Sequence, residues 1–378
     1  MKKVILLDVD GVLVMPGGYR AALHATLNYF ASLMGAPHFD FHEEKIAELE
    51  KRGIFSEWDM VPVLLGAAWN DILCKVGNEN LPSDLKSAAI EIGRRMNGYV
   101  TKDLVIPEFE ILPNVYPTES ALQHGCFPHL PEALRRNLLH DSRNVHFSQT
   151  TRLFQHFSLG SRVFSETYNL PVEVETESFL QTHDTSNLTD ETLAKLLQPH
   201  VHLASITARP SAPPKDVTTS HIGYAPEAEA ALELVGLADI PLIGYGRLEY
   251  YEKQNGVAAA SLLKPSPVQS LAAVAAAFTG AEWSSIQAAA EWQATGRLNS
   301  IFSSLPREFE LIVVEDTMGG IRSAIKAGEI LREMGWNVTT RALGITSGAI
   351  SKAEAFRKAN VPFFDSLASA IDSLDTLK

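Results

Sequence analysis

The chain has 378 residues, of which 46% are hydrophobic and 20% are charged, a composition that is ordinary for a globular protein of about two domains. Its formal net charge of −13 disfavours a nucleic-acid partner, and no apolar stretch approaches the ~20 residues needed to span a bilayer, so no membrane partner is expected. Cys74 and Cys126 are the only cysteines, too few for a disulfide framework or a cysteine-rich metal site, and we expect a cytoplasmic protein.

The first predicted element is a buried parallel strand over Val4–Leu7, an apolar run too short for a membrane span or a signal-peptide core. Asp8, Asp10 and Gly11 follow this run directly. Because ligands bind beyond the carboxyl ends of strands in open α/β sheets, the two carboxylates are candidates for a functional site. An ordinary turn is the alternative, since Asp and Gly both favour turns.

A mainly helical region is expected next, with helices where apolar residues recur at helical spacing. The clearest of these patterns cover Tyr19–Met34, Glu43–Arg52, Leu85–Met96 and Asp184–Leu197. The last pattern contains a capping residue, Thr189 or Asp190. We therefore expect residues 15–199 to form an inserted helical domain, and residues 1–14 and 200–378 to form a core around the first strand.

Apolar segments and helical patterns alternate after this region. The apolar segments cover Val201–Ile206, Ile240–Tyr245, Phe309–Val314, Val338–Gly344 and Val361–Phe364, and the helical patterns cover Pro226–Leu234, Pro267–Phe278 and Gly319–Gly328. Such alternation is typical of a mostly parallel sheet with helices on both faces. The predicted fold class is therefore α/β, with a doubly wound sheet and a large helical insertion.

Four further side chains complete a set that phosphoryl transfer needs. Thr207, Glu315 and Asp316 each follow an apolar segment, and Lys264 opens a turn before a helix. One carboxylate can act as a nucleophile and a second can move the proton of the leaving group. A hydroxyl and an ammonium can hold the phosphoryl oxygens, and further carboxylates can hold Mg²⁺. Each residue also has a structural alternative, as a strand cap, a solvated lysine or a turn, and it is their order along the chain that favours phosphoryl transfer.

In these segments the chain resembles the haloacid dehalogenase superfamily, in particular its phosphatase and phosphomutase branch. The resemblance lies in Val4–Leu13 (VILLDVDGVL), Leu203–Arg209 (LASITAR), Leu263–Pro265 (LKP) and Leu311–Gly328 (LIVVEDTMGGIRSAIKAG). It implies a Rossmann-like core into which residues 15–199 are inserted as a cap domain. The insertion is larger than the helical cap usual in that family, and none of its segments matches a family motif.

The resemblance also implies a metal site and an acid–base pair. Asp8 would be the nucleophile and a Mg²⁺ ligand through its carboxylate. Asp10 would be the general acid and base, with its main-chain carbonyl on Mg²⁺. Asp316 would bind Mg²⁺ directly, and Glu315 would be a ligand or be held through water.

The remaining matched residues would bind the substrate. Thr207 and Lys264 are expected to act in catalysis by holding the phosphoryl oxygens, and Gly11 would let the chain turn into the cap beside the substrate. Arg209 has two open roles, because a guanidinium could bind a substrate anion or pair with a carboxylate on a neighbouring loop.

The leading expectation is a Mg²⁺-dependent phosphatase that hydrolyses a small phosphorylated metabolite through an aspartyl-phosphate. Asp10 disfavours carbon–halogen cleavage, because the dehalogenases of the family lack an acid–base carboxylate at that place. The alternatives are an intramolecular phosphomutase, which would isomerise a sugar phosphate without accumulating free phosphate, and a catalytically idle protein that binds or regulates. The sequence indicates neither the substrate nor the oligomeric state.

Overall fold

The computed structural model describes residues 2–36, 39, 43–96, 104–113 and 115–374. The chain folds into two compact units. One comprises Met1–Pro16 and Leu180–Lys378 and contains the parallel sheet, and the other comprises Gly17–Phe179 and is helical. Helix α9 (Phe179–His183) lies at their boundary in the sequence.

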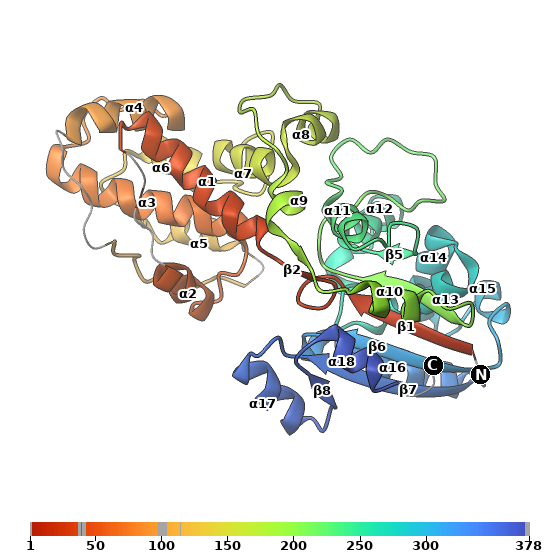
Figure 1. The fold of residues 1–378 in the computed structure, drawn as a ribbon. Coiled ribbons are helices and arrows are strands. Elements are labelled where there is room, and N and C mark those ends of the chain that lie inside the picture. The colour runs from red at the N-terminus through yellow and green to blue at the C-terminus, as the bar shows by residue number, and fades with distance from the viewer. Residues whose placement is uncertain (1, 37–38, 40–42, 97–103, 114, 375–378) are drawn as a thin grey trace. The chain divides into compact units, whose positions relative to one another are not determined.

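The first unit is built on a six-stranded sheet whose strands all run parallel, in the order β5-β4-β1-β6-β7-β8. These strands are β1 (Lys2–Asp8), β4 (Val201–Ile206), β5 (Leu242–Ile243), β6 (Glu308–Glu315), β7 (Asn337–Ile345) and β8 (Phe363–Phe364). Figure 1 shows β1, β6 and β7 in this sheet. Two short strands, β2 (Val14–Met15) and β3 (Thr185–Ser186), form a separate antiparallel pair. The predicted α/β fold class is confirmed.

Helices cover both faces of the sheet, which explains why β1 is an uninterrupted apolar run. The helices of this unit are α10 (Asp190–Leu196), α11 (Glu227–Leu234), α12 (Tyr245–Asn255), α13 (Pro267–Thr279), α14 (Glu282–Thr295), α15 (Ser300–Ser303), α16 (Met318–Glu333), α17 (Ile350–Lys358) and α18 (Leu367–Asp372), with a 3₁₀ turn over Ala259–Ser261. Val4 and Leu6 of β1 pack into a core with residues of α13 and α16. Ile5 and Leu7 pack into a second core, with residues of α11 and α18.

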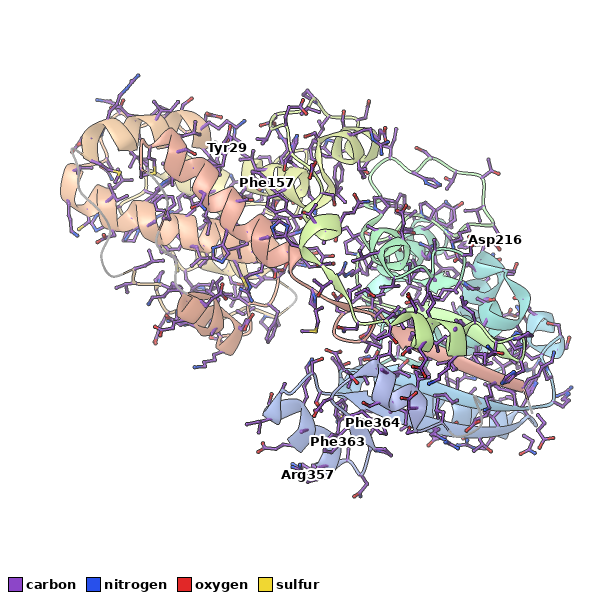
Figure 2. All side chains as sticks on the ribbon, viewed as in Figure 1. Tyr29, Phe157, Asp216, Arg357, Phe363 and Phe364 are labelled. Atoms are coloured by element: carbon purple, nitrogen blue, oxygen red, sulfur yellow. The ribbon has the colours of Figure 1, made fainter. Side chains whose placement is uncertain are left out.

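The edge strand β8 holds helix α17 through aromatic contacts. Phe363 of β8 (Figure 2) is half-buried. Its ring stacks on that of Phe356 of α17, with the centroids 6.4 Å apart. The guanidinium of Arg357, also on α17, lies 5.6 Å from the centroid of the Phe363 ring. These contacts fix α17 beside the sheet, and α17 also carries Lys352, which reaches the candidate site described below.

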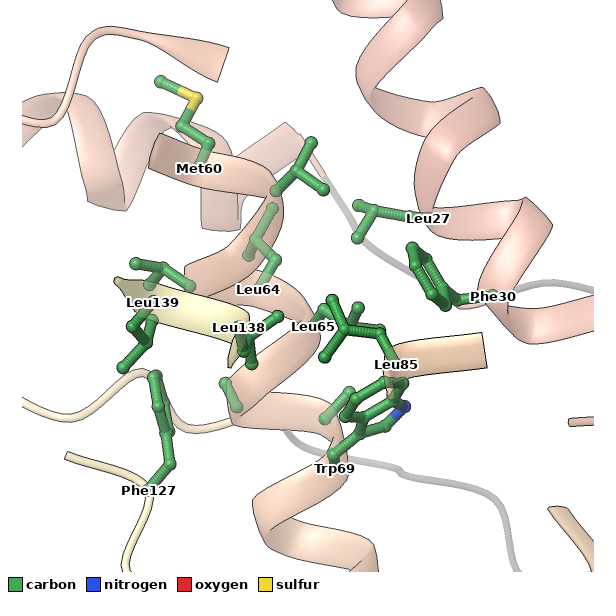
Figure 3. Packing of buried hydrophobic residues seen from close by; sticks show 14 of the residues in the cluster. Leu27, Phe30, Met60, Leu64, Leu65, Trp69, Leu85, Phe127, Leu138 and Leu139 are labelled. Carbon is green, nitrogen blue, oxygen red and sulfur yellow. The ribbon is translucent and has the colours of Figure 1, made fainter. Parts of the chain in front are cut away.

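The second unit is formed by helices packed around an apolar core. They are α1 (Gly18–Leu33), α2 (Glu43–Lys51), α3 (Glu57–Val76), α4 (Leu85–Met96), α5 (Pro117–Gln123), α6 (Glu132–Leu139), α7 (Gln149–Leu159) and α8 (Ser161–Tyr168). Figure 3 shows Leu64, Leu65 and Trp69 of α3 within this core. The rings of Phe30 of α1 and Trp69 meet edge to face, with their centroids 5.8 Å apart.

Helix α3 is the central element that the sequence patterns do not predict. Its buried residues lie on nearly all sides, from Met60 to Trp69 without a break, so no helical periodicity marks it. Pro62 lies inside the helix and adds a signal against a helix in the sequence. No helix in the described part of the chain is both long and apolar enough to cross a membrane.

The helical unit ends earlier than the predicted insertion. The prediction extends to residue 199, whereas the compact unit ends at Phe179. Helix α10 belongs to the sheet unit because Leu196 is buried in the core around Leu7. Thr189 caps α10, in agreement with the predicted capping signal, but β3 occupies residues that the prediction assigned to this helix.

Candidate functional site

Three predicted site residues lie at the carboxyl edge of neighbouring strands. Asp8 ends β1, and Glu315 ends β6, which pairs with β1 in parallel. On the other side of β1, Ile206 of β4 is the register partner of Asp8, so Thr207 begins the loop directly beyond this pair. The pairing therefore brings three distant parts of the sequence to the edge at which α/β sheets bind ligands.

Lys264 reaches the same edge from the loop between the 3₁₀ turn and α13. Its Nζ lies 2.8 Å from Oδ2 of Asp8 and 2.6 Å from Oε1 of Glu315. The three side chains are 12%, 6% and 0% exposed, respectively. Burial by itself lowers the pKa of Lys264, but the carboxylates of Asp8 and Glu315 together raise it above its ordinary value. The lysine is therefore a fixed positive charge between two carboxylates.

The carboxylates of Asp8, Glu315 and Asp316 form a cluster that suits a cation. One oxygen from each lies within 4.8 Å of the others. Burial and the nearby Glu315 raise the pKa of Asp8 well above its usual range, and burial raises the pKa of Asp316. A divalent cation with oxygen ligands would relieve this crowding of negative charge, so the cluster fits Mg²⁺. The three side chains expected to bind the metal are thus close together.

Two glycines let the backbone approach these carboxylates closely. Gly11 has a φ of +72°, and a Cβ atom there would lie 2.5 Å from Oδ2 of Asp316. A Cβ atom at Gly320, in the first turn of α16, would collide with Oε1 of Glu315. Gly11 therefore has a steric role in addition to the predicted one of letting the chain turn. Gly320 lies within the resembling segment but had no predicted role.

Asp10, the second carboxylate after β1, forms a bidentate ion pair with Arg209. Nε of Arg209 donates to Oδ1 and Oδ2 of Asp10 at 2.9 and 3.0 Å, and Nη2 donates to Oδ1 at 2.6 Å. Nη2 also donates to Oδ2 of Asp184 at 2.9 Å. Of the two roles that the sequence left open for Arg209, the structure contains the pairing with a carboxylate. Asp184 begins one of the predicted helical patterns, but it lies outside every segment that carries the resemblance.

Gln269, which the sequence analysis does not single out, connects the two residues expected to hold the phosphoryl group. Its Nε2 donates to the main-chain oxygens of Thr207 at 3.0 Å and Ile243 at 2.7 Å. Its Oε1 accepts the N–H of Lys264 at 3.0 Å. The side chain is fully buried in α13, among alanines and other apolar residues. A lone amide on the apolar face of an alanine-rich helix is the signal that could have indicated it.

Lys352 of α17 is a second cation that none of the motifs contains. Its Nζ lies 2.6 Å from Oδ2 of Asp316, and its side chain is 33% exposed. The three clustered carboxylates thus face two ammonium groups, those of Lys264 and Lys352. No spacing in the sequence relates Lys352 to Asp316, because α17 is placed by its packing on the sheet edge.

The fold and the site define an α/β protein with an acidic cluster and a buried lysine at the carboxyl edge of a six-stranded parallel sheet. Comparison of the chain with known protein families, with curated proteins and with solved structures finds no match. A function for the site must therefore be inferred from its own residues and from the motif resemblance.

Proposed function

We propose that the chain is a Mg²⁺-dependent phosphatase of the haloacid dehalogenase superfamily that hydrolyses a small phosphorylated metabolite. The observation that carries this proposal is the pairing of Lys264 with both Asp8 and Glu315, because it joins three of the four resembling segments at one edge of the sheet. Thr207, from the fourth segment, is tied to Lys264 through Gln269. The motif order and the contacts support the same reaction.

In the first step Asp8 would act as the nucleophile. One of its carboxylate oxygens attacks phosphorus, the bond from phosphorus to the leaving oxygen breaks, and Asp10 gives that oxygen a proton. Lys264 and Thr207 would bind the phosphoryl oxygens and offset their charge. The ion pair with Lys264 favours the ionised, nucleophilic form of Asp8, and so opposes burial and Glu315, which raise the pKa of this carboxyl.

In the second step the aspartyl-phosphate would be hydrolysed. Asp10, now ionised, takes a proton from a water molecule, whose oxygen attacks phosphorus while the bond to the Asp8 oxygen breaks. Phosphate leaves, Asp8 is again a carboxylate, and Asp10 again carries the proton. The same two side chains therefore serve both halves of the reaction.

Asp8, Glu315 and Asp316 are the side chains that would hold Mg²⁺. When bound, this ion would offset the negative charge of the transferring phosphoryl group. The three carboxylates supply the hard oxygen ligands that Mg²⁺ prefers, and one oxygen of each lies within 4.8 Å of the others.

Phosphate release from a panel of phosphorylated metabolites tests the proposal. We expect release in the presence of Mg²⁺, loss of release in a chelator, and recovery when Mg²⁺ is added back. Excess Ca²⁺ should inhibit, because its longer and more variable coordination would misplace the Asp8 nucleophile. The ranking of the substrates would identify the class of metabolite.

Other outcomes would contradict parts of the proposal. Release that persists in the chelator would overturn the metal assignment. Isomerisation of a sugar phosphate without free phosphate would indicate a phosphomutase. Tight binding of a phosphorylated compound without turnover would indicate a binding protein.

A further inference from the structure

We propose that Arg209 is a positioning residue that fixes the carboxylate of Asp10 for proton transfer, with Asp184 as the anchor of the guanidinium. The inference rests on the proposed phosphatase function, in which Asp10 protonates the leaving oxygen. It gives Arg209 a role other than substrate binding, and it adds Asp184 to the functional residues.

The guanidinium of Arg209 is held on two sides. It donates three hydrogen bonds to Asp10, at 2.6 to 3.0 Å, and one to Asp184 at 2.9 Å. The side chains of Arg209 and Asp184 are 2% and 0% exposed, whereas that of Asp10 is 36% exposed. The buried Asp184 thus holds the buried guanidinium of Arg209. Of the three side chains, only the Asp10 carboxylate is open to a reacting group.

The backbone around these three residues is also tied together. Asp184 immediately precedes β3, and β3 pairs with β2, which follows the Asp10 loop. The main-chain N–H of Arg209 donates to Oγ1 of Thr207 at 3.1 Å. The main chain at Arg209 and the paired strands therefore restrict how far the guanidinium can turn.

A bidentate guanidinium fixes the rotation of an ionised carboxylate, which a single ammonium does not. When Asp10 carries the proton for the leaving oxygen, one of its oxygens is an O–H donor, and Arg209 holds the carboxyl group through the other. Proton transfer requires the acid to lie within hydrogen-bond reach of the leaving oxygen, and a displacement of about 1 Å can slow a reaction about 10²-fold. Loss of Arg209 should therefore slow the steps in which Asp10 moves a proton more than the steps that only bind substrate.

Two substrates with different leaving groups separate this role from a merely structural one. An alkyl phosphate needs a proton on its leaving oxygen, whereas p-nitrophenolate leaves with little help from an acid. The value of kcat/KM reports the steps up to the departure of the leaving group, so hydrolysis of the aspartyl-phosphate does not enter it. For Arg209→Met we expect the alkyl-to-p-nitrophenyl ratio of kcat/KM to fall about 10²-fold. Arg209→Lys and Asp184→Asn should shift this ratio in the same direction by less.

Replacement of Asp10 shows whether Arg209 acts through it. In an Asp10→Asn background, Arg209→Met should add no further loss with the alkyl substrate, because residues that act as a unit give non-additive losses. Arg247 is a matched control, since it is fully buried and paired with Glu282 at 3.0 Å in the same unit. Arg247→Met should leave the ratio unchanged. Equal losses of kcat/KM on both substrates for Arg209→Met, or an undiminished loss in the Asp10→Asn background, would overturn the proposal.

Crystal structures test the role of Arg209 independently of the proposed phosphatase activity. If the wild type releases phosphate from neither substrate, the phosphatase proposal fails, and the structures of Arg209→Lys and the wild type still decide the role of Arg209. We expect the Asp10 carboxylate to change its orientation in the variant while Asp8 and Lys264 keep theirs. An Asp10 side chain in its wild-type position would overturn the inference.

Discussion

Gln269 makes three hydrogen bonds to main-chain groups. Those to the oxygens of Thr207 and Ile243 are buried, and the one from the N–H of Lys264 is partly buried. A buried polar group left without its partner costs about 1–3 kcal/mol. The amide therefore stabilises the loop ends behind the site, and it ties together the main chains of the two residues whose hydroxyl and ammonium are expected to hold the phosphoryl group. Both effects should be measurable in one variant.

We predict that Gln269→Met, which keeps the volume of the side chain and removes its hydrogen bonds, lowers the free energy of unfolding by about 1–3 kcal/mol. It should also lower kcat/KM by about 10²-fold, because Thr207 and Lys264 are no longer held in register. Urea unfolding and steady-state kinetics measure the two effects. Ser270→Ala is the control, since Ser270 lies on the same helix and bonds to Ser323 instead. Wild-type kcat/KM in Gln269→Met would contradict the positioning role.

Lys352 would compete with a bound cation for Asp316, because its Nζ donates a hydrogen bond to Oδ2 of that carboxylate at 2.6 Å. We predict that Lys352→Met binds Mg²⁺ up to about tenfold more tightly than the wild type, as measured by titration calorimetry. Lys326→Met, which removes an exposed pair with Glu329 on α16, should leave the affinity for Mg²⁺ unchanged. Equal or weaker binding in Lys352→Met would show that this ammonium does not oppose the cation.

The sequence predicts the residues whose positions follow from strand ends, and it misses those placed by tertiary packing. Asp8, Thr207 and Glu315 each end or follow an apolar strand, so parallel pairing alone brings them together. Gln269 and Lys352 come from helices with no motif, and their contacts depend on how α13 and α17 pack on the sheet. Such packing leaves no regular spacing in the sequence.

At the scale of elements, most of the helical and apolar patterns after residue 200 correspond to observed helices and strands of the sheet unit, although Tyr245 of the predicted apolar segment Ile240–Tyr245 begins α12. The predicted helix over Gly319–Gly328 is the middle of α16, and the one over Pro267–Phe278 is α13. Helix α3 escapes prediction because its burial on nearly all sides removes the contrast on which helical periodicity depends.

His156 couples the stability of the helical unit to pH. Its ring stacks on Phe164, its Nδ1 lies 2.8 Å from the main-chain oxygen of Arg152, and its Nε2 accepts the N–H of Glu173 at 3.0 Å. This acceptor role requires a neutral ring. Burial lowers the pKa of His156 below its ordinary value of 6.5. As the pH falls, His156 is therefore protonated in the unfolded chain before it is protonated in the folded protein. Its contribution to stability is present above pH 6.5 and is lost as the pH falls through the lower pKa of the folded state.

We predict that wild-type stability falls more steeply than that of His156→Gln between pH 7.5 and pH 5.5, by at most about 1.4 kcal/mol per pH unit, the limit for one proton. Urea unfolding at the two pH values measures the difference. His146→Gln, at an exposed histidine of the same unit, should keep the wild-type pH dependence. Identical slopes for the wild type and His156→Gln would contradict the prediction.

At the scale of the whole molecule, two compact units share one chain because the sheet unit is completed by residues on both sides of the helical one. The sequence predicts this insertion from the change in pattern after the first strand. It does not predict where the insertion ends, because α10 is an ordinary amphipathic helix in the sequence and only its packing through Leu196 assigns it to the sheet unit.

The most direct test of the proposed reaction compares phosphate release by the wild type and by Asp8→Asn in the presence of Mg²⁺. Asparagine keeps the size of the side chain and an oxygen for the N–H of Val9, but it cannot form the aspartyl-phosphate. We predict that release falls by about 10³-fold or more while the circular dichroism spectrum stays that of the wild type. Undiminished phosphate release by a folded Asp8→Asn protein would contradict the proposed mechanism, because the reaction would then not pass through this carboxylate.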